Sequence, residues 1–196
     1  MKLTVFYDYT CPFCYITSKN LETLSNEFDL DIEWKGIEIH PEIPSQGQKS
    51  SRSLKSIKTV ESIKGAANES GTVIALPGFR TNSRLSLEAS EFAKTRNRFK
   101  GFHDSIFEAY FADRKNIGDL KIVIEAGIKA GLDGAELEEC LGKRTMFHKV
   151  EENKKAAQSN LVTGVPTLIM GKFPVYGNQS LETLRHMIRR AIERTA

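Results

Sequence analysis

A chain of 196 residues is long enough for one good core, or for one domain that carries a large insertion. Hydrophobic residues make up 40% and charged residues 27%, which is ordinary for a globular protein and argues against a disordered chain. No stretch approaches the roughly 18 apolar residues of a membrane-spanning helix, and a net charge of +3 is too small and too dispersed to predict nucleic-acid binding. We therefore expect neither a membrane nor a nucleic acid as a partner.

The first 40 residues follow the order strand, helix, strand. Residues 2–7 form a β-rich run that ends at Asp8, and an amphipathic helical pattern follows. Residues 30–35 alternate apolar and charged side chains, which predicts a half-buried strand. The alternation slips by one residue at Gly36 and then resumes, so we expect a bulge or bend there. This order is typical of the start of a parallel sheet.

The middle of the chain is helical in its hydrophobic period. Residues 40–53 are polar and predict a loop, and the apolar stripes that follow have helical spacing. Asp119 predicts a helix N-cap, and Asp133 with Glu136 has the spacing of a capping box. Six of the eleven phenylalanines lie between positions 79 and 111. We interpret them as the core of a helical bundle rather than as a cofactor site.

The last 35 residues return to a strand pattern. Residues 165–170 and 173–176 predict two short strands joined by a tight turn, and Ser180 predicts the cap of a final amphipathic helix. The strands at the two ends of the chain therefore predict an α/β fold. We expect residues 1–40 and 161–196 to form one split domain, and residues 41–160 to form an α-helical insertion domain.

The cysteines bear on the cellular compartment. Three cysteines cannot form the dense disulfide framework of a small secreted domain. Asp8 also interrupts any apolar signal-peptide core near the N-terminus. Both observations favour a cytoplasmic location.

The motif Cys11-Pro12-Phe13-Cys14 lies where a predicted strand ends and a predicted helix begins. Pro12 suits the first helical position, because the N–H that proline lacks would be unpaired there. Cys11 then occupies the N-cap, where free backbone N–H groups and the positive end of the helix dipole meet its sulfur. Both effects favour the thiolate, and such sites lower the pKa of a cysteine from about 8.5 into the range ~3.5–7.5.

The two cysteines of the motif are not equivalent. Cys14 lies seven residues before Leu21 and fourteen before Phe28, so it shares the buried face of the helix, whereas Cys11 is expected at the exposed tip. We therefore assign the attacking nucleophile to Cys11 and the resolving thiol to Cys14. Their spacing on a helical turn lets the sulfurs form a disulfide with little movement of the backbone.

The same motif has two other interpretations, half of a zinc site or a purely structural pair. No second CxxC is present, and the four histidines are scattered without ligand spacing, so we expect no metal. A cytoplasmic disulfide without a redox role is unusual. Cys140 shares an apolar face with Leu137 and Leu141, so we expect it to be a buried, inert thiol.

The run from Cys11 to Tyr15, followed much later by Gly164-Val165-Pro166-Thr167, resembles the DsbA-like branch of the thioredoxin superfamily. The chain is most similar to the FrnE-like oxidoreductases, whose relatives include the 2-hydroxychromene-2-carboxylate isomerases. The resemblance covers essentially the whole chain, with further similarity in residues 82–85, 109–111 and 117–119. It implies a thioredoxin fold with a large α-helical insertion.

The resemblance also implies substrate-binding residues. It implies that the Val165–Pro166 bond is cis and faces the dithiol. Val165 would then offer its backbone to an extended substrate segment, and Pro166 would keep backbone from crowding the sulfurs. Phe13 stands where FrnE-like proteins commonly have tryptophan, and we count it with the substrate-binding residues because the intervening pair tunes the thiolate. The isomerase relatives typically carry serine in place of Cys11, so two cysteines favour dithiol–disulfide exchange.

These inferences predict a protein disulfide oxidoreductase that exchanges disulfides with protein thiols or with glutathione. It would need no metal and no tightly bound organic cofactor, with glutathione acting only as a redox co-substrate. Two alternatives stay open. One is a glutathione-dependent isomerase or transferase of a small aromatic substrate, and the other is a non-catalytic peptide-binding or chaperone module.

Overall fold

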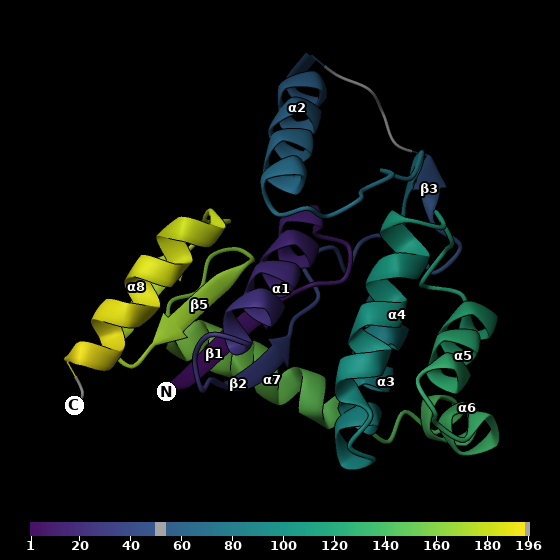
Figure 1. Cartoon of the computed structure of the whole chain (residues 1–196). Helices are drawn as coiled ribbons and strands as arrows, with labels where there is room; N and C mark the ends of the chain where they lie inside the picture. The colour runs from purple at the N-terminus through teal and green to yellow at the C-terminus, as the bar shows by residue number, and fades with distance from the viewer. Residues whose placement is uncertain (50–53, 195–196) are drawn as a thin grey trace.

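In the computed structural model, which describes residues 1–49 and 54–194, four strands form a sheet in the order β2-β1-β5-β6 (Figure 1). β1 pairs in parallel with β2 and antiparallel with β5, and β5 forms an antiparallel hairpin with β6. Both ends of the chain therefore contribute to one sheet. The strands are Lys2–Tyr7 (β1), Asp31–Gly36 (β2), Thr167–Met170 (β5) and Phe173–Tyr176 (β6).

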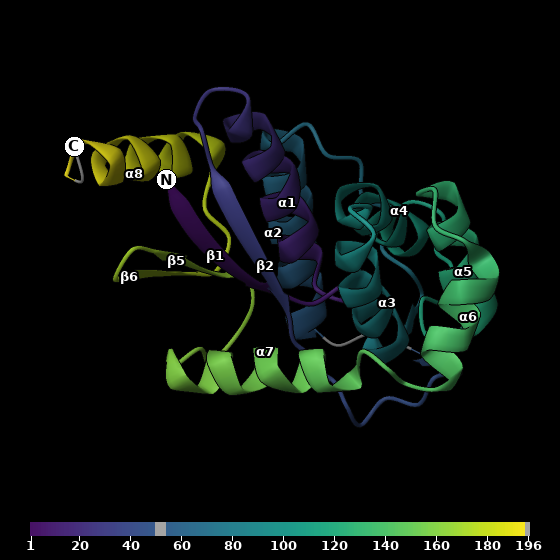
Figure 2. The same ribbon diagram turned by 90° about the horizontal axis from the view of Figure 1, so that it is seen from below.

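Helices cover both faces of this sheet (Figure 2). α1 (Pro12–Ser25) and α8 (Leu181–Glu193) lie on one face, and α7 (Phe147–Ser159) lies on the other. Between the sheet and the first pair of helices is a core of fully or nearly fully buried aliphatic side chains, which are Leu3, Val5, Leu21, Leu24, Leu168, Met170, Leu184 and Ile188.

The rest of the chain forms the helical insertion beside the sheet (Figure 1). α3, α4, α5 and α6 pack against one another, whereas α2 packs against α1. A short antiparallel ladder pairs β3 (Gln48–Lys49), which precedes α2 in the sequence, with β4 (Phe79–Arg80), which follows α2. The helices are Leu54–Glu69 (α2), Arg84–Thr95 (α3), Phe99–Phe111 (α4), Leu120–Lys129 (α5) and Gly134–Gly142 (α6).

The phenylalanines between positions 79 and 111 form the centre of a second core, as predicted. Phe92, Phe102, Phe107 and Phe111 are buried in one cluster with residues of β1 and α1, and the other two pack against it. Aromatic rings continue this cluster to the first turn of α1, where the Tyr15 ring stacks on Phe107 at 5.1 Å. The insertion therefore shares its core with the segment that carries the cysteines.

The predicted helix caps are confirmed. The Asp119 carboxylate accepts a hydrogen bond from the Lys121 N–H at 2.8 Å, and the Asp133 carboxylate accepts one from the Glu136 N–H at 2.9 Å. The Ser180 hydroxyl likewise accepts from the Thr183 N–H at 3.1 Å and begins α8. These bonds satisfy N–H groups that have no partner within the helix.

Two local expectations were wrong. The predicted loop 40–53 contains β3, which its polar residues do not signal, while residues 50–53 lie outside the described part of the chain. β2 does not resume after Gly36 but ends there. Close packing explains the glycine at this position, since a Cβ at Gly36 would lie 2.5 Å from Leu87 Cδ2 and 3.3 Å from the Tyr7 ring. The division of the chain at residues 40 and 160 stays a prediction.

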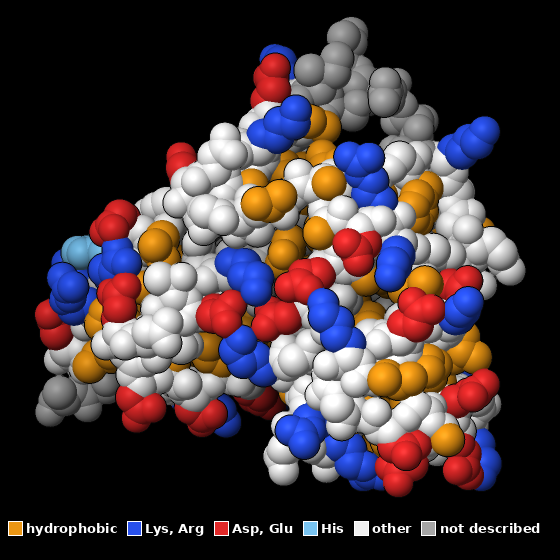
Figure 3. Space-filling view, turned by 45° about the vertical axis from the view of Figure 1, so that its right-hand side comes forward, with side chains coloured by type: hydrophobic (Ala, Val, Ile, Leu, Met, Phe, Trp, Pro, Cys, Tyr) orange, Lys and Arg blue, Asp and Glu red, His pale blue; other side chains and the backbone are white. Residues whose placement is uncertain are grey.

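Charged side chains are dispersed over the surface. On the face drawn in Figure 3, lysine and arginine side chains lie among aspartate and glutamate side chains. Lys100, for example, lies 2.5 Å from a Glu22 oxygen and 3.1 Å from an Asp104 oxygen. Within the described residues, no helix is both long and apolar enough to cross a membrane.

Gly118 provides a test of packing at the junction between α4 and α5. A Cβ there would lie 2.7 Å from the Ser45 carbonyl oxygen and 3.1 Å from the Asn82 carbonyl oxygen, so backbone would have to move. We expect Gly118→Ala to lower the free energy of unfolding by about 1–3 kcal/mol in urea denaturation. Gly142→Ala is the control, because no atom lies within 4 Å of its Cβ position. Equal stability of the two variants would contradict this packing.

Candidate active site

β1 delivers the CxxC motif to the start of α1. After β1 the chain turns so that the Cys11 N–H donates to the Asp8 carbonyl at 3.1 Å. Cys11 is the N-cap of α1, with φ −92° and ψ 114°, and Pro12 occupies the first turn. The Cys11 carbonyl accepts from the Cys14 N–H at 3.1 Å and from the Tyr15 N–H at 3.3 Å. The predicted N-cap position of Cys11 is therefore confirmed.

The expected exposure of Cys11 was wrong. The residue is 7% exposed, against 1% for Cys14, and both thiols are free. The Cys11 Sγ lies 3.5 Å from the Val165 carbonyl oxygen, so the loop before β5 covers it. The aromatic cluster of the insertion packs on the same turn. Sequence periodicity places a residue on a helix face, but it does not reveal which distant loop covers the helix end.

The environment of Cys11 lowers its pKa from the ordinary value for a thiol. The largest cause is the hydrogen bond between the two thiols, in which Cys14 stabilises a Cys11 thiolate. The backbone N–H groups of Cys14 and Phe13 act in the same direction, as expected at a helix N-terminus. Burial and the negative charge of Asp8 oppose this effect but do not reverse it.

Cys14 has the opposite tendency. Burial is the largest cause that raises its pKa well above the ordinary value, and the neighbouring Cys11 raises it further. The pair therefore holds one proton preferentially on the inner sulfur and one negative charge preferentially on the outer sulfur. Such a pair can attack a disulfide through Cys11 while Cys14 stays protonated.

A buried carboxylate, which was not predicted as a site residue, lies beside the dithiol. Asp8 is 0% exposed, and its oxygens accept four hydrogen bonds at 2.7–3.0 Å. The donors are the Thr10 N–H and hydroxyl, the Ile39 N–H and the Ser83 hydroxyl. Burial raises the pKa of Asp8, and the four donors oppose the rise. The available signal was an acidic residue directly after a buried strand and three residues before Cys11.

A buried polar chain runs beneath α1. Tyr9 Oη lies 3.2 Å from His103 Nδ1, and His103 Nε2 lies 3.1 Å from the Ser18 hydroxyl. Burial, followed by nearby lysines, lowers the pKa of His103 well below the ordinary value. The imidazole is therefore neutral near pH 7, and it links α4 to the turn after β1 and to α1.

The other predicted site residues, Phe13, Val165 and Pro166, lie around the turn that contains the cysteines. The Val165–Pro166 bond is cis, and the Pro166 carbonyl accepts from the Gly177 N–H at 2.8 Å, which continues the β5–β6 pairing. Val165 and Phe13 are partly buried against the aromatic core of the insertion. Phe13 also packs against the small cluster of Ile16, Ile63 and Ala67 between α1 and α2. The roles assigned to these residues stay predictions.

Cys140 lies apart from this site, in α6. It is 6% exposed, and its Sγ lies 2.9 Å from the Thr145 hydroxyl oxygen. Burial raises its pKa, which favours the unreactive thiol. The buried position predicted for it is confirmed. In the part of the chain that the structure describes, no three His, Cys, Asp or Glu residues are grouped so that they could hold a metal ion.

A sheet of this topology with a CxxC at a helix N-terminus defines the thioredoxin fold class. The family model for the DSBA-like thioredoxin domain matches residues 2–189, and the chain belongs to this family. It is 30% identical over 179 residues to the uncharacterized protein YwbO of Bacillus subtilis (strain 168). The aligned region covers 89% of this chain and 89% of that protein.

Solved structures show the same fold. The probable DsbA oxidoreductase SCO1869 of Streptomyces coelicolor superposes with a TM-score of 0.87 at 20% identity, covering 98% of this chain and 90% of that one. A 2-hydroxychromene-2-carboxylate isomerase superposes with a TM-score of 0.83 at 21% identity, covering 100% and 98%. The predicted family and the predicted fold, a thioredoxin fold with an α-helical insertion, are confirmed.

The pKa difference between the two thiols predicts selective alkylation. We expect iodoacetamide to modify Cys11 with a rate that rises through a midpoint below the ordinary thiol pKa of about 8.5, because a lowered pKa gives more thiolate at lower pH. Cys14 should stay unmodified over the same range. Mass spectrometry of peptides quenched between pH 4 and 9 measures both rates. A Cys11 midpoint near 8.5 would contradict thiolate stabilisation.

Asp8→Asn tests the buried carboxylate. The amide removes the negative charge that raises the pKa of both thiols, so the midpoint for Cys11 alkylation should move to lower pH. The amide also cannot accept all four hydrogen bonds, so the free energy of unfolding should fall by about 1–3 kcal/mol. Ser83→Ala is the matched control, since it removes one of the donors and keeps the charge. A shift of equal size in both variants would show that the charge has no role.

Proposed function

We propose that this protein is a thiol–disulfide oxidoreductase that works through the Cys11–Cys14 pair. The observation that carries the proposal is geometric. Cys11 is the N-cap of α1, its Sγ lies 3.5 Å from the Val165 carbonyl oxygen at the cis peptide, and Cys14 is buried on the same helical turn. The lowered pKa of Cys11 and the raised pKa of Cys14 agree with disulfide exchange, which requires a thiolate to attack and a second thiol to resolve.

The first step is attack on a substrate disulfide. The Cys11 thiolate forms a new S–S bond to one substrate sulfur, and the original S–S bond breaks. The second substrate sulfur leaves as a thiolate and takes a proton from solvent. The product of this step is a mixed disulfide between Cys11 and the substrate.

The second step resolves the mixed disulfide. Cys14 loses its proton, and its sulfur attacks Cys11 Sγ, which lies on the same helical turn. The bond between Cys11 and the first substrate sulfur breaks, and that sulfur is released as a thiolate and protonated by solvent. The substrate is then reduced by two electrons and the pair is oxidised to a disulfide. Two glutathione molecules, oxidised to one glutathione disulfide, would return the pair to its dithiol form.

The loop around the cis peptide supplies the substrate-binding side of the proposal. Val165 lies next to Cys11 Sγ and would align an extended substrate through its backbone. Pro166 has no N–H, and Phe13 offers a partly buried ring beside the dithiol. Protein thiols and glutathione are both substrates of this chemistry, and the cytoplasm is the proposed compartment.

A glutathione-dependent isomerase is the second candidate, because the chain superposes closely on a 2-hydroxychromene-2-carboxylate isomerase. An isomerase would use added glutathione as the working thiol, so its activity would survive Cys14→Ser. A peptide-binding module is the third candidate, and it would bind peptide equally well after both cysteines are replaced. Cys14 is buried next to Cys11 and hydrogen-bonded to it, which favours the dithiol mechanism over both.

Equilibration in glutathione buffers tests the proposed function. We expect thiol trapping and mass spectrometry to show a reversible Cys11–Cys14 disulfide. A potential above roughly −230 mV would make the protein an oxidant or isomerase, and one near −270 mV or below would make it a reductant. Cys11→Ser should lose exchange with a model disulfide, and Cys14→Ser should accumulate a glutathione adduct on Cys11. If the wild-type protein forms only that adduct, the dithiol mechanism is wrong.

A further inference from the structure

A groove at the other end of the sheet has no role in the chemistry described above. It lies between α8 and the β5–β6 hairpin and has a volume of about 830 Å³. Its apolar wall consists of Met1, Met170, Phe173, Val175 and Met187. Three of the four methionines of the chain therefore line it. Methionine side chains are flexible and polarisable, and they are common on surfaces that bind apolar ligands.

The groove exists because α8 covers only part of its sheet face. Met170 and Phe173 are cross-strand partners, so their side chains lie on the same face. Met170 is 4% exposed beneath α8, but Phe173 is 63% exposed. An aromatic side chain at a core-facing position thus stays open to solvent. A ligand that covered this ring would remove apolar surface from water, which favours binding.

Cations surround this apolar wall. Arg190 in the last turn of α8 and Arg194 at its C-cap line the groove, and so does Lys172 in the hairpin turn. Among the described residues, no carboxylate lies within 4.0 Å of these three cations. Lys2 also lines the groove and lies 3.9 Å from Glu33, with its side chain 71% exposed. Among the residues that the structure describes, no Asp or Glu lines the groove, so its charged lining side chains are positive.

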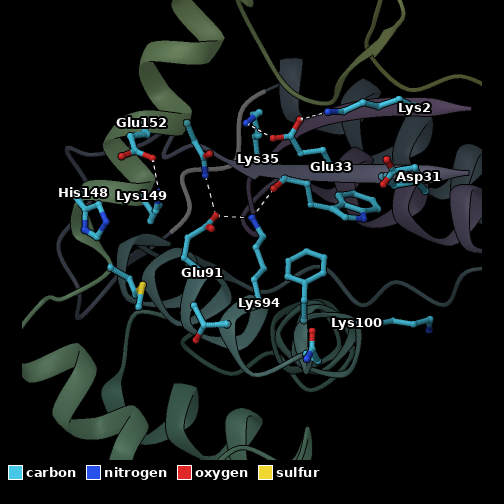
Figure 4. A pocket seen from close by; sticks show the side chains of 17 residues that line it. Lys2, Asp31, Glu33, Lys35, Glu91, Lys94, Lys100, His148, Lys149 and Glu152 are labelled. Carbon is cyan, nitrogen blue, oxygen red and sulfur yellow. Dashed lines mark hydrogen bonds and ion pairs between the residues drawn. The ribbon is translucent and has the colours of Figure 1, made fainter.

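A second hollow differs from this groove, because its lysines are paired with carboxylates. It has a volume of about 980 Å³, lies at the edge of β2 and also contains several lysines (Figure 4). There, however, Lys94 lies 2.7 Å from Glu91 and Lys149 lies 2.9 Å from Glu152. Lys94 also donates to the Trp34 carbonyl at 2.6 Å. These lysines are already paired with carboxylates of the same hollow, so they attract an added anion less strongly.

The charge of the α8 groove also decides between possible occupants. A second copy of this chain placed on it by a two-fold axis would bring one positive rim against the other. Addition of a peptide strand to β6 is disfavoured, because Pro174 lacks one backbone donor on this strand. The volume lies within the roughly 300–1,000 Å³ of small-molecule sites.

We propose that this groove binds a single molecule of an aliphatic monocarboxylate, such as a free fatty acid. The hydrocarbon tail of this ligand lies against Phe173 and the methionines, and its carboxylate pairs with Arg190 and Arg194. Both interactions are needed, because the arginines alone would bind any small anion weakly at the surface, and the apolar wall alone would not choose the charge of a ligand.

The experiment titrates sub-micellar dodecanoate into the full chain by calorimetry and repeats the titration with dodecyltrimethylammonium, which has the same chain and the opposite charge. We expect saturable binding of dodecanoate at one site. The double variant Arg190→Glu with Arg194→Glu should weaken binding by about tenfold or more. Lys154→Glu with Lys155→Glu is the matched control, since these exposed α7 residues lie outside the groove and change the net charge equally.

Phe173→Ala provides a second variant that leaves the arginines and the buried core in place, and it should also weaken binding. Exchange at Cys11 should be unchanged in both groove variants, so failure of this proposal is separate from failure of the proposed function. Three results would overturn it. These are equal affinity for the cationic probe, unchanged affinity in the arginine variant, and binding only to phosphatidylglycerol vesicles.

Discussion

The buried carboxylate of Asp8 holds the segments around the dithiol in position. Asp8 follows the last residue of β1, and its four hydrogen bonds join three segments that are distant in sequence. Thr10 belongs to the turn before the dithiol, Ile39 follows β2, and Ser83 precedes α3 of the insertion. A buried charge is tolerated only when its hydrogen bonds are satisfied, so these segments must keep their positions. The site of Cys11 is built on that arrangement.

This arrangement also joins the insertion to the candidate site. Near Ser83, Glu38 accepts from Asn82 at 2.7 Å and from Arg84 at 2.8 Å, which holds the start of α3 against the segment after β2. The aromatic core of α4 reaches Tyr15 in the first turn of α1. Because this core excludes water from the cysteines, burial and hydrogen bonding can act strongly on their proton affinities.

Local sequence signals predicted most of the fold and part of the site. The strand–helix order, the caps at Asp119 and Ser180, and the N-cap position of Cys11 depend on neighbours in sequence, and these were predicted correctly. The burial of Cys11 depends on Val165, 154 residues away, and the role of Asp8 depends on donors up to 75 residues away. Periodicity contains no information about such contacts. The two-residue β3–β4 ladder is likewise fixed by pairing over 30 residues, not by the polar residues of β3.

The α8 groove and the dithiol lie at opposite ends of the sheet. β1 begins at Lys2, which lines the groove, and ends directly before Asp8 beside the dithiol, a rise of roughly 17 Å over its length. β5 runs in the opposite direction, from the residue after Pro166 to Met170 in the groove. The shared strands pack against α1 and α8 in one close-packed aliphatic core, which fixes the separation of the two ends. Surface changes at the hairpin can therefore alter the groove while the proton affinities of Cys11 and Cys14, set by contacts at the opposite end, stay the same.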